Sequence, residues 1–218
     1  MEPNRDPKAK RTGGTPLREA CLQKALEAIR DKGVEGLSLR DVARRLNVSH
    51  QAPYKHFASK DHLLAEVIRR CLRDFATHLR RSGDADDGTH QPPLDAMRAL
   101  GSAYLGYAAA NPLEYRLMFM TTWPNEARGF GLASDSRAAF DVLGERLQAV
   151  RPYDSSAERD RDAMFVWSAI HGIASVLQSE AMHYLSFSPS EAEAAVAHAR
   201  SMIDRAIARV SDRQEDDQ

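Results

Sequence analysis

The residues best suited to chemistry in this sequence form a short run of side chains that can read nucleic-acid bases. This run contains Ser49, His50, Gln51, Tyr54 and Lys55. A glutamine can bond adenine through two hydrogen bonds, and a histidine or lysine can donate to guanine. Tyrosine, serine and lysine also bond backbone phosphates. We therefore expect the outer face of this segment to contact DNA in a major groove.

The distribution of charge favours a polyanionic partner for the first part of the chain. The 218 residues carry a net charge of -1, but residues 1–60 hold 13 Lys/Arg against 7 Asp/Glu, and residues 61–218 hold 17 against 24. A basic segment attracts nucleic acid electrostatically. A solvated basic tail is the alternative interpretation, because residues 5–11 supply four of the basic side chains.

Two short helices are needed to position the base-reading run. Ser38 should cap the first, over residues 38–46, with Asp41 completing a capping box. Asn47 can adopt the left-handed conformation that closes a helix. Ser49 should then cap a second helix over 49–57. Helices joined this closely form a helix-turn-helix, which also places Arg40 near a groove edge or a phosphate.

The rest of the sequence predicts an all-α fold, since helical periodicity dominates and no alternating strand pattern occurs. We expect a disordered basic tail at 1–14, a DNA-binding domain at 15–60 and a helical effector-binding and dimerisation domain at 61–218. Further helices are expected at 15–33, 59–80, 93–110, 112–120, 132–149, 156–185 and 190–210.

Several classes of protein are disfavoured. The longest apolar runs are far shorter than a membrane span, and the charged start does not resemble a secretory signal. Cys21 and Cys71 are too few for a disulfide scaffold, so we expect buried, inert thiols in a reducing cytoplasm. Glu180 and His183 have di-iron spacing but lack the other ligands. We expect no enzyme activity, no metal and no cofactor.

The helix-turn-helix segment resembles the N-terminal domain of TetR/AcrR-family transcriptional regulators. The resemblance rests on residues 36–43, Val48-Ser49, the run 54–60 and Leu63-Leu64. It implies an all-helical homodimer with a variable C-terminal effector domain. It also implies that Tyr54, His56 and Lys60 contact phosphates, that Arg40, His50 and Gln51 face bases, and that Phe57 lies in the core. Asn47 replaces the usual Gly, and Pro53 is a departure that can shift the helix axis.

A second resemblance covers the C-terminal part. Trp167, His171 and Gly172, together with the run 111–119, resemble the WHG-type C-terminal domain of some TetR-like regulators. Trp167 and His171 lie on one helix face and either line an effector pocket or form a core pair with a hydrogen-bonded histidine. The same two alternatives, cavity wall or filled core, apply to the wider candidate set: Tyr104, Tyr107, Met118, Phe119, Trp123, Trp167 and His171.

The last helix carries a continuous apolar face that we interpret as a dimer seam. Its members are small or flexible apolar residues: Ala199, Met202, Ile203, Ala206, Ile207 and Val210. The alternative is that this helix only covers its own domain.

Together these observations predict a ligand-responsive transcriptional regulator, a repressor that binds a palindromic operator in double-stranded DNA as a homodimer and responds to an unknown small-molecule effector. The alternative is a helical enzyme or small-molecule carrier with a vestigial DNA-binding module.

Overall fold

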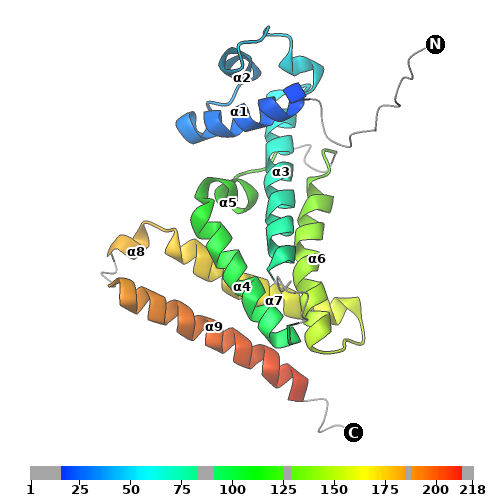
Figure 1. Ribbon diagram of the computed structural model, residues 1–218, viewed down its shortest axis with the longest axis vertical. Coiled ribbons are helices and arrows are strands. Elements are labelled where there is room, and N and C mark those ends of the chain that lie inside the picture. The colour runs from blue at the N-terminus through cyan, green and yellow to red at the C-terminus, as the bar shows by residue number, and fades with distance from the viewer. Residues whose placement is uncertain (1–15, 83–90, 125–128, 185–187, 213–218) are drawn as a thin grey trace, which may run out of the picture. The chain divides into compact units, whose positions relative to one another are not determined.

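A computed structural model describes residues 16–82, 91–124, 129–184 and 188–212 of the 218-residue chain. All regular elements in these residues are helical, with no strand among them (Figure 1), so the all-α prediction is confirmed. The expected tail at 1–14 lies outside the described residues. The elements are α1 (Pro16–Lys32), α2 (Leu39–Arg45), η1 (Pro53–Lys55), α3 (Lys60–Arg81), α4 (Pro93–Ala110), α5 (Pro112–Phe119), α6 (Leu132–Val150), α7 (Ser156–Leu177), α8 (Ala181–Tyr184) and α9 (Pro189–Asp212).

The chain divides into two compact units within α3, between Val67 and Ile68. The expected boundary at residue 60 lies at the start of that helix. The first two turns of α3 belong with the first unit because Leu63, Leu64 and Val67 are buried there. The remainder of α3 belongs to the second unit, so one helix contributes to both cores.

The first unit is built on the apolar face of α1. Cys21, Leu22, Ala25 and Ile29 recur at helical spacing and are all buried, which gives α1 one face to pack on α2 and η1. The helix is followed by Gly33, whose φ of 71° is a left-handed conformation that glycine adopts without strain.

Only one half of the predicted capping box forms at the start of α2. Ser38 is extended, and its Oγ accepts a hydrogen bond from the Asp41 backbone N–H at 3.1 Å. The Asp41 carboxylate, however, bonds basic side chains of α1 and α2. The helix is therefore capped by Ser38, and Asp41 takes part in tertiary contacts.

The predicted helix over 49–57 is wrong. This segment contains turns at 50–52 and the single 3₁₀ turn η1. Pro53 has no N–H to donate to the Ser49 carbonyl, which instead accepts from Ala52 at 2.9 Å. The Pro53 carbonyl then accepts from the N–H groups of His56 and Phe57. Proline thus replaces a regular α-helix with a tighter chain path.

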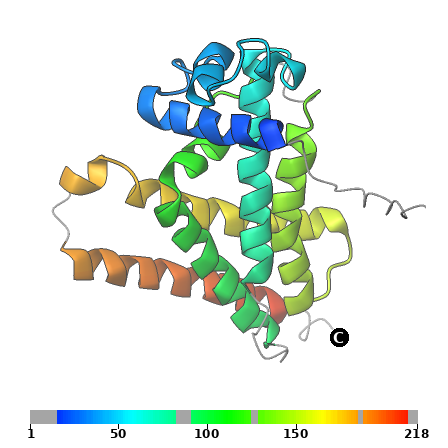
Figure 2. The same ribbon diagram turned by 45° about the horizontal axis from the view of Figure 1, so that its top comes forward.

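The second unit is a bundle in which α4, α6 and α7 pack against one another, and α9 packs on α7 (Figure 2). The predicted helix at 156–185 is interrupted. After Leu177, Ser179 donates both its N–H and its hydroxyl to the Val176 carbonyl, which ends α7 before the short α8 begins. Serine commonly competes for backbone groups in this way.

We predict that Asn47, which has a φ of 54°, stabilises the turn after α2 because asparagine tolerates the left-handed region. Asn47→Ala should lower the free energy of unfolding by about 1 kcal/mol, as measured by urea denaturation. Asn47→Gly is the matched control and should change stability little. Equal losses in both variants would show that the Asn47 side chain, rather than its backbone conformation, is what matters.

Candidate functional site

The candidate DNA-reading residues lie on the surface of the first unit. The side chains of Arg40, Ser49, His50, Gln51, Tyr54 and Lys55 are exposed. Beneath them, Pro53 and Phe57 are buried, so this segment is anchored by two apolar residues and presents polar ones outward. The predicted core position of Phe57 is confirmed by its complete burial.

The two remaining candidate phosphate contacts, His56 and Lys60, are half-buried. The Lys60 ammonium donates to the backbone carbonyl of Glu35 at 3.0 Å. That bond uses one of its three donors and holds the positive charge beside the loop before α2. Residues 38–60 together contain five Lys/Arg and one Asp, so the surface that carries the candidates is strongly basic.

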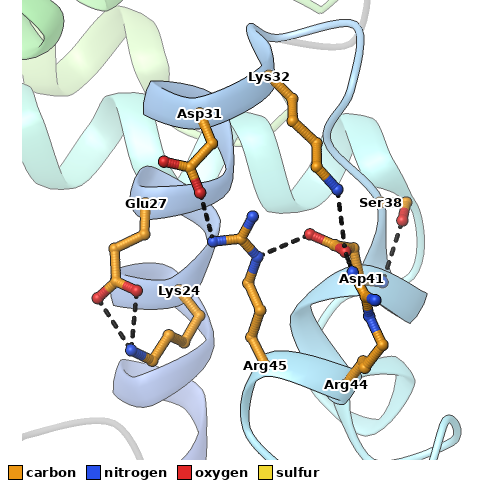
Figure 3. Close-up of polar contacts among 8 residues, drawn as sticks. All are labelled: Lys24, Glu27, Asp31, Lys32, Ser38, Asp41, Arg44 and Arg45. Atoms are coloured by element: carbon orange, nitrogen blue, oxygen red, sulfur yellow. Dashed lines mark hydrogen bonds and ion pairs between the residues drawn. The ribbon is translucent and has the colours of Figure 1, made fainter.

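That one acidic residue, Asp41, joins α1 to α2 (Figure 3). Its carboxylate accepts from Arg45 Nε at 2.7 Å, from Lys32 Nζ at 3.3 Å and from Arg44. Arg45 extends the network, because its second nitrogen donates to Asp31 on α1 at 2.8 Å. Arg45 therefore bridges a carboxylate on each helix and fixes α2 on its support.

These cations hold the pKa of Asp41 well below its ordinary value, with the hydrogen bond from Arg45 as the largest cause. The carboxylate thus stays ionised across the physiological range, and the surrounding basic groups keep a fixed counter-charge. Sequence reasoning assigned Asp41 to a cap and missed this role. The only signal was the placement of Arg44 and Arg45 three and four residues after it.

Residues 49–57, here called the reading segment, are also tied to α1. Arg18 forms an ion pair with Glu66, which is 5% exposed, and its guanidinium lies 5.7 Å from the centroid of the Phe57 ring. His62 completes this corner, since its Nδ1 accepts from the Ala58 N–H and its ring packs edge-on against Phe57. Phe57 is therefore held by both α1 and α3.

The second unit encloses a cavity of about 620 Å³, within the range of small-molecule sites. Its wall is mostly aliphatic and aromatic and comes from α3, α4, α6, α7, α9 and the end of α5. The residues that line it are Leu72, Phe75, Leu79, Met97, Arg98, Leu100, Gly101, Tyr104, Met118, Phe119, Thr121, Trp123, Ser136, Arg137, Ala139, Phe140, Leu143, Val166, Trp167, Ile170, Arg200, Ile203, Asp204 and Ile207.

Five of the seven candidate pocket residues lie on this wall: Tyr104, Met118, Phe119, Trp123 and Trp167. The other two do not line it. Tyr107 is buried against Phe75, with ring centroids 5.0 Å apart. His171 lies behind the wall in a hydrogen-bonded cluster. The candidate set named no residue of α3, α6 or α9, each of which contributes to the wall.

His171 is held by two tyrosines. Its Nδ1 is 2.7 Å from the Tyr115 hydroxyl and 3.0 Å from that of Tyr104, within hydrogen-bond distance of both. Burial lowers the pKa of His171 and favours its neutral form. The ring also packs on Trp167 and Phe119. This arrangement matches the structural interpretation of His171, while Trp167 reaches the cavity.

The candidate dimer residues of α9 divide between two environments. Ile203 and Ile207 line the cavity, and Ile207 is 6% exposed within its own chain. Ala199 and Ala206 are half-buried, and Met202 is 52% exposed. The side chain of Val210 lies outside the described residues. The two isoleucines thus line a cavity of their own chain, and the interpretation of the apolar face of α9 as a dimer seam stays a prediction.

Besides Met202 of α9, outward-facing apolar residues lie on α7. Met164, Phe165 and Val176 are each at least half exposed. Their spacing places them along one side of the helix, together with the exposed Ser168 and Gly172. An unpartnered apolar helix face of this kind is typical of an interface.

The described residues offer few other reactive or ligand-binding groups. Both cysteines are buried and free, and burial raises the pKa of Cys21 and raises that of Cys71 to about 12. Such thiols are poor nucleophiles. Within the described ranges, no group of three metal-binding side chains gathers. Nor is any helix there long and apolar enough to cross a membrane.

A helix-turn-helix unit followed by a helical bundle with a cavity defines a class of bacterial regulators, and comparison with known proteins agrees. Residues 22–67 match the family described as bacterial regulatory proteins, tetR family, and residues 97–204 match the tetracyclin repressor-like C-terminal domain. The chain belongs to the TetR family of transcriptional regulators.

Curated relatives include the HTH-type transcriptional regulator Rv1816 of Mycobacterium tuberculosis, 32% identical over 122 residues, which is 55% of this chain and 50% of that one. BetI of Burkholderia ambifaria is 31% identical over 143 residues, 64% of each. The chain thus spans about half to two thirds of the length of these relatives.

Solved structures share the fold over most of the chain. A Rhodococcus protein of unknown function has a TM-score of 0.71 at 24% identity, covering 91% of this chain and 98% of that one. A putative tetR family regulator from Shewanella has a TM-score of 0.61 at 17% identity, covering 88% and 96%.

We predict that Asp41 contributes to acid stability. Because its pKa is lowered on folding, its contribution is complete above the ordinary value of 3.8 and is lost as the pH falls below that value. Asp41→Asn should lower the free energy of unfolding at pH 7 by about 1 kcal/mol, a modest figure because Lys32 and Arg44 are exposed. It should also weaken the loss of stability between pH 4 and about pH 2.5.

Urea unfolding at each pH measures both effects. Glu35→Gln is the control, since it removes an exposed carboxylate from the neighbouring loop. An acid-induced loss that is the same in Asp41→Asn as in the wild type would contradict the role assigned to Asp41.

Proposed function

We propose that this chain is a DNA-binding transcriptional regulator, a ligand-responsive repressor that acts as a homodimer on a palindromic operator. The observation that carries the proposal is the surface of the first unit, where six candidate DNA-reading side chains are exposed above the buried Pro53 and Phe57. Such a regulator acts in the cytoplasm, where bacterial DNA lies.

Charge supplies general affinity, and the polar side chains supply selectivity. The basic residues of 38–60 attract phosphates, which makes binding depend on salt. Arg40, His50 and Gln51 offer donors and acceptors that suit base edges. Lys55 can donate to guanine. Tyr54, His56 and Lys60 are proposed to contact the backbone and so fix the orientation of the reading segment.

The cavity of the second unit is the proposed effector site, and α3 is the proposed link to the DNA-binding unit. Leu72, Phe75 and Leu79 of α3 line the cavity. Asp135 on α6 accepts from Arg69 at 2.7 Å and from Arg73 at 3.3 Å, which ties α3 to a second cavity wall. An effector that prefers a different spacing of these helices shifts α3 and lowers operator affinity.

The exposed apolar face of α7 supports a homodimer. One reading segment contacts too few base pairs for a selective regulator, so two copies are needed. Pairing α7 and the exposed part of α9 with the same surface of a second copy would bury Met164, Phe165 and Met202. A helical carrier would explain the cavity but would not explain the basic surface formed by residues 38–60.

Retention of genomic DNA fragments at moderate salt tests the proposed function directly. Retention of a specific fragment that is released by a small molecule is the expected result. Failure to retain any fragment, together with turnover of a small molecule, would favour the enzyme alternative.

We predict that Gln51 and Lys60 contribute to DNA binding in different ways. Gln51→Ala should weaken operator binding by about 1–3 kcal/mol and relax the preference at one base pair. Lys60→Ala should weaken operator and random DNA alike and reduce the salt slope by about one. Fluorescence anisotropy at several salt concentrations measures both. Gln23→Ala, at an exposed position on α1, is the control. Equal losses on operator and random DNA for Gln51→Ala would rule out base reading.

We predict that Phe165→Glu produces monomers, since it places a charge in the centre of a desolvated seam. Sedimentation of the wild type at micromolar concentration should give twice the chain mass. Ala133→Glu, at an exposed position on α6, is the control and should remain dimeric. Ile203→Glu and Ile207→Glu are poorer tests, because both residues line the cavity. A wild type that sediments as a monomer would contradict the homodimer.

A further inference from the structure

The residues that line the cavity of the second unit indicate the chemical class of its ligand. Most of its wall is apolar, with six aromatic residues contributed by α3 to α7 and the segments between them: Phe75, Tyr104, Phe119, Trp123, Phe140 and Trp167. Four charged residues of the described part of the chain also line it, three of which are arginines. How these charges are paired determines which kind of ligand the cavity accepts.

Two of the three arginines are neutralised by carboxylates. Arg98 donates to Asp204 at 2.9 Å and to Asp95 at 2.8 Å. Arg137 pairs with Asp141 at 2.7 Å and with Asp160 at 2.9 Å. Asp204, the only carboxylate among the described lining residues, is therefore already occupied by Arg98. Neither arginine needs a ligand to compensate its charge.

Arg200 is different. It projects from α9 to α4, where its guanidinium donates to the Ser102 hydroxyl at 2.6 Å and to the Arg98 carbonyl at 3.4 Å. Both acceptors are neutral, and among the described residues no carboxylate lies within ion-pair distance of it. Arg200 thus brings to the cavity wall a guanidinium that forms no ion pair with a described carboxylate.

A hydroxyl in the wall has unmet hydrogen-bonding capacity. The Ser136 Oγ on α6 is buried and has no hydrogen-bond partner in the described part of the chain. Ser136 lines the same cavity. Buried polar atoms without partners are rare in folded proteins, and a ligand atom is one of the groups that can satisfy them.

We propose that the effector is an apolar organic acid, with its carboxylate bound by Arg200 at the α4–α9 side of the cavity and its apolar body against the aromatic wall. This inference rests on the proposed function only in taking the cavity as the effector site. A planar guanidinium matches a carboxylate in geometry and charge. A cationic ligand would face three arginines and a carboxylate that Arg98 already occupies.

The test compares acids with neutral molecules of the same shape. The probes are octanoate with octan-1-ol and 2-naphthoate with 2-naphthol, which also separate aliphatic from aromatic bodies. Trp123 and Trp167 are the chain's two tryptophans and both line the cavity, so their fluorescence reports binding. The full-length wild type should bind at least one acid about tenfold more tightly than its alcohol, the size expected for a charge-assisted hydrogen bond.

Variants of Arg200 identify the carboxylate partner. Arg200→Gln should weaken binding of the acid about tenfold and leave the alcohol unchanged, while Arg200→Lys should retain part of the preference. Arg205→Gln is the matched control, because Arg205 is exposed on the same helix and bonds only Met202 and Ser201 in the described contacts. Arg205→Gln should bind all four probes as the wild type does.

Three results would overturn the inference: acids and alcohols that bind equally, an Arg200→Gln variant that weakens both equally, or no binding of either acid at millimolar concentration. Retention of operator DNA by the ligand-free wild type is measured separately. A protein that binds the acids but no DNA would refute the proposed regulator and leave the ligand class standing. A protein that binds operator DNA but neither acid would refute the ligand class and leave the proposed regulator standing.

Discussion

The structure depends on the amphipathic character of α3. Its buried positions, from Leu63 through Ile68 and Leu72 to Leu79, recur at helical spacing along 22 residues. Those apolar side chains must be covered along the whole length, and one small domain cannot do so. The first turns are covered by the helix-turn-helix unit and the later turns by the bundle. One helix thus carries both the side chains that complete the first core and the side chains that line the cavity.

Local features of the fold were predictable from sequence because they depend on neighbours along the chain. Ser38 as a cap, Asn47 in the left-handed region and the breaks near Asn111 and Pro189 all follow from the preferences of single residues. The error at 49–57 has a local cause as well. Ser49 as an expected cap favoured a helix there, whereas the missing N–H of Pro53 determines the chain path.

Features that join distant segments were not predictable. Arg45 bonds Asp31 across 14 residues, and His171 meets Tyr104 and Tyr115 across more than 50. Helical periodicity shows that a residue such as Ile207 is apolar on one face, but it does not show which neighbour covers that face. Here Ile207 is buried within its own chain and lines the cavity. Likewise, only the tertiary arrangement shows that Asp204, four residues after Arg200 on α9, pairs with Arg98 of α4.

In the reading segment, the residues that anchor the backbone differ from those that are exposed. Pro53 and Phe57 fix its backbone from below, whereas Ser49, His50 and Gln51 contribute little to the core because they are exposed. Substitutions at exposed positions usually change stability by no more than about 0.5 kcal/mol. Mutation can therefore alter the base-facing side chains without lowering the fraction of folded protein. For a regulator of the proposed kind, a duplicated gene can thus acquire a new DNA target by a few such substitutions while the second unit stays unchanged.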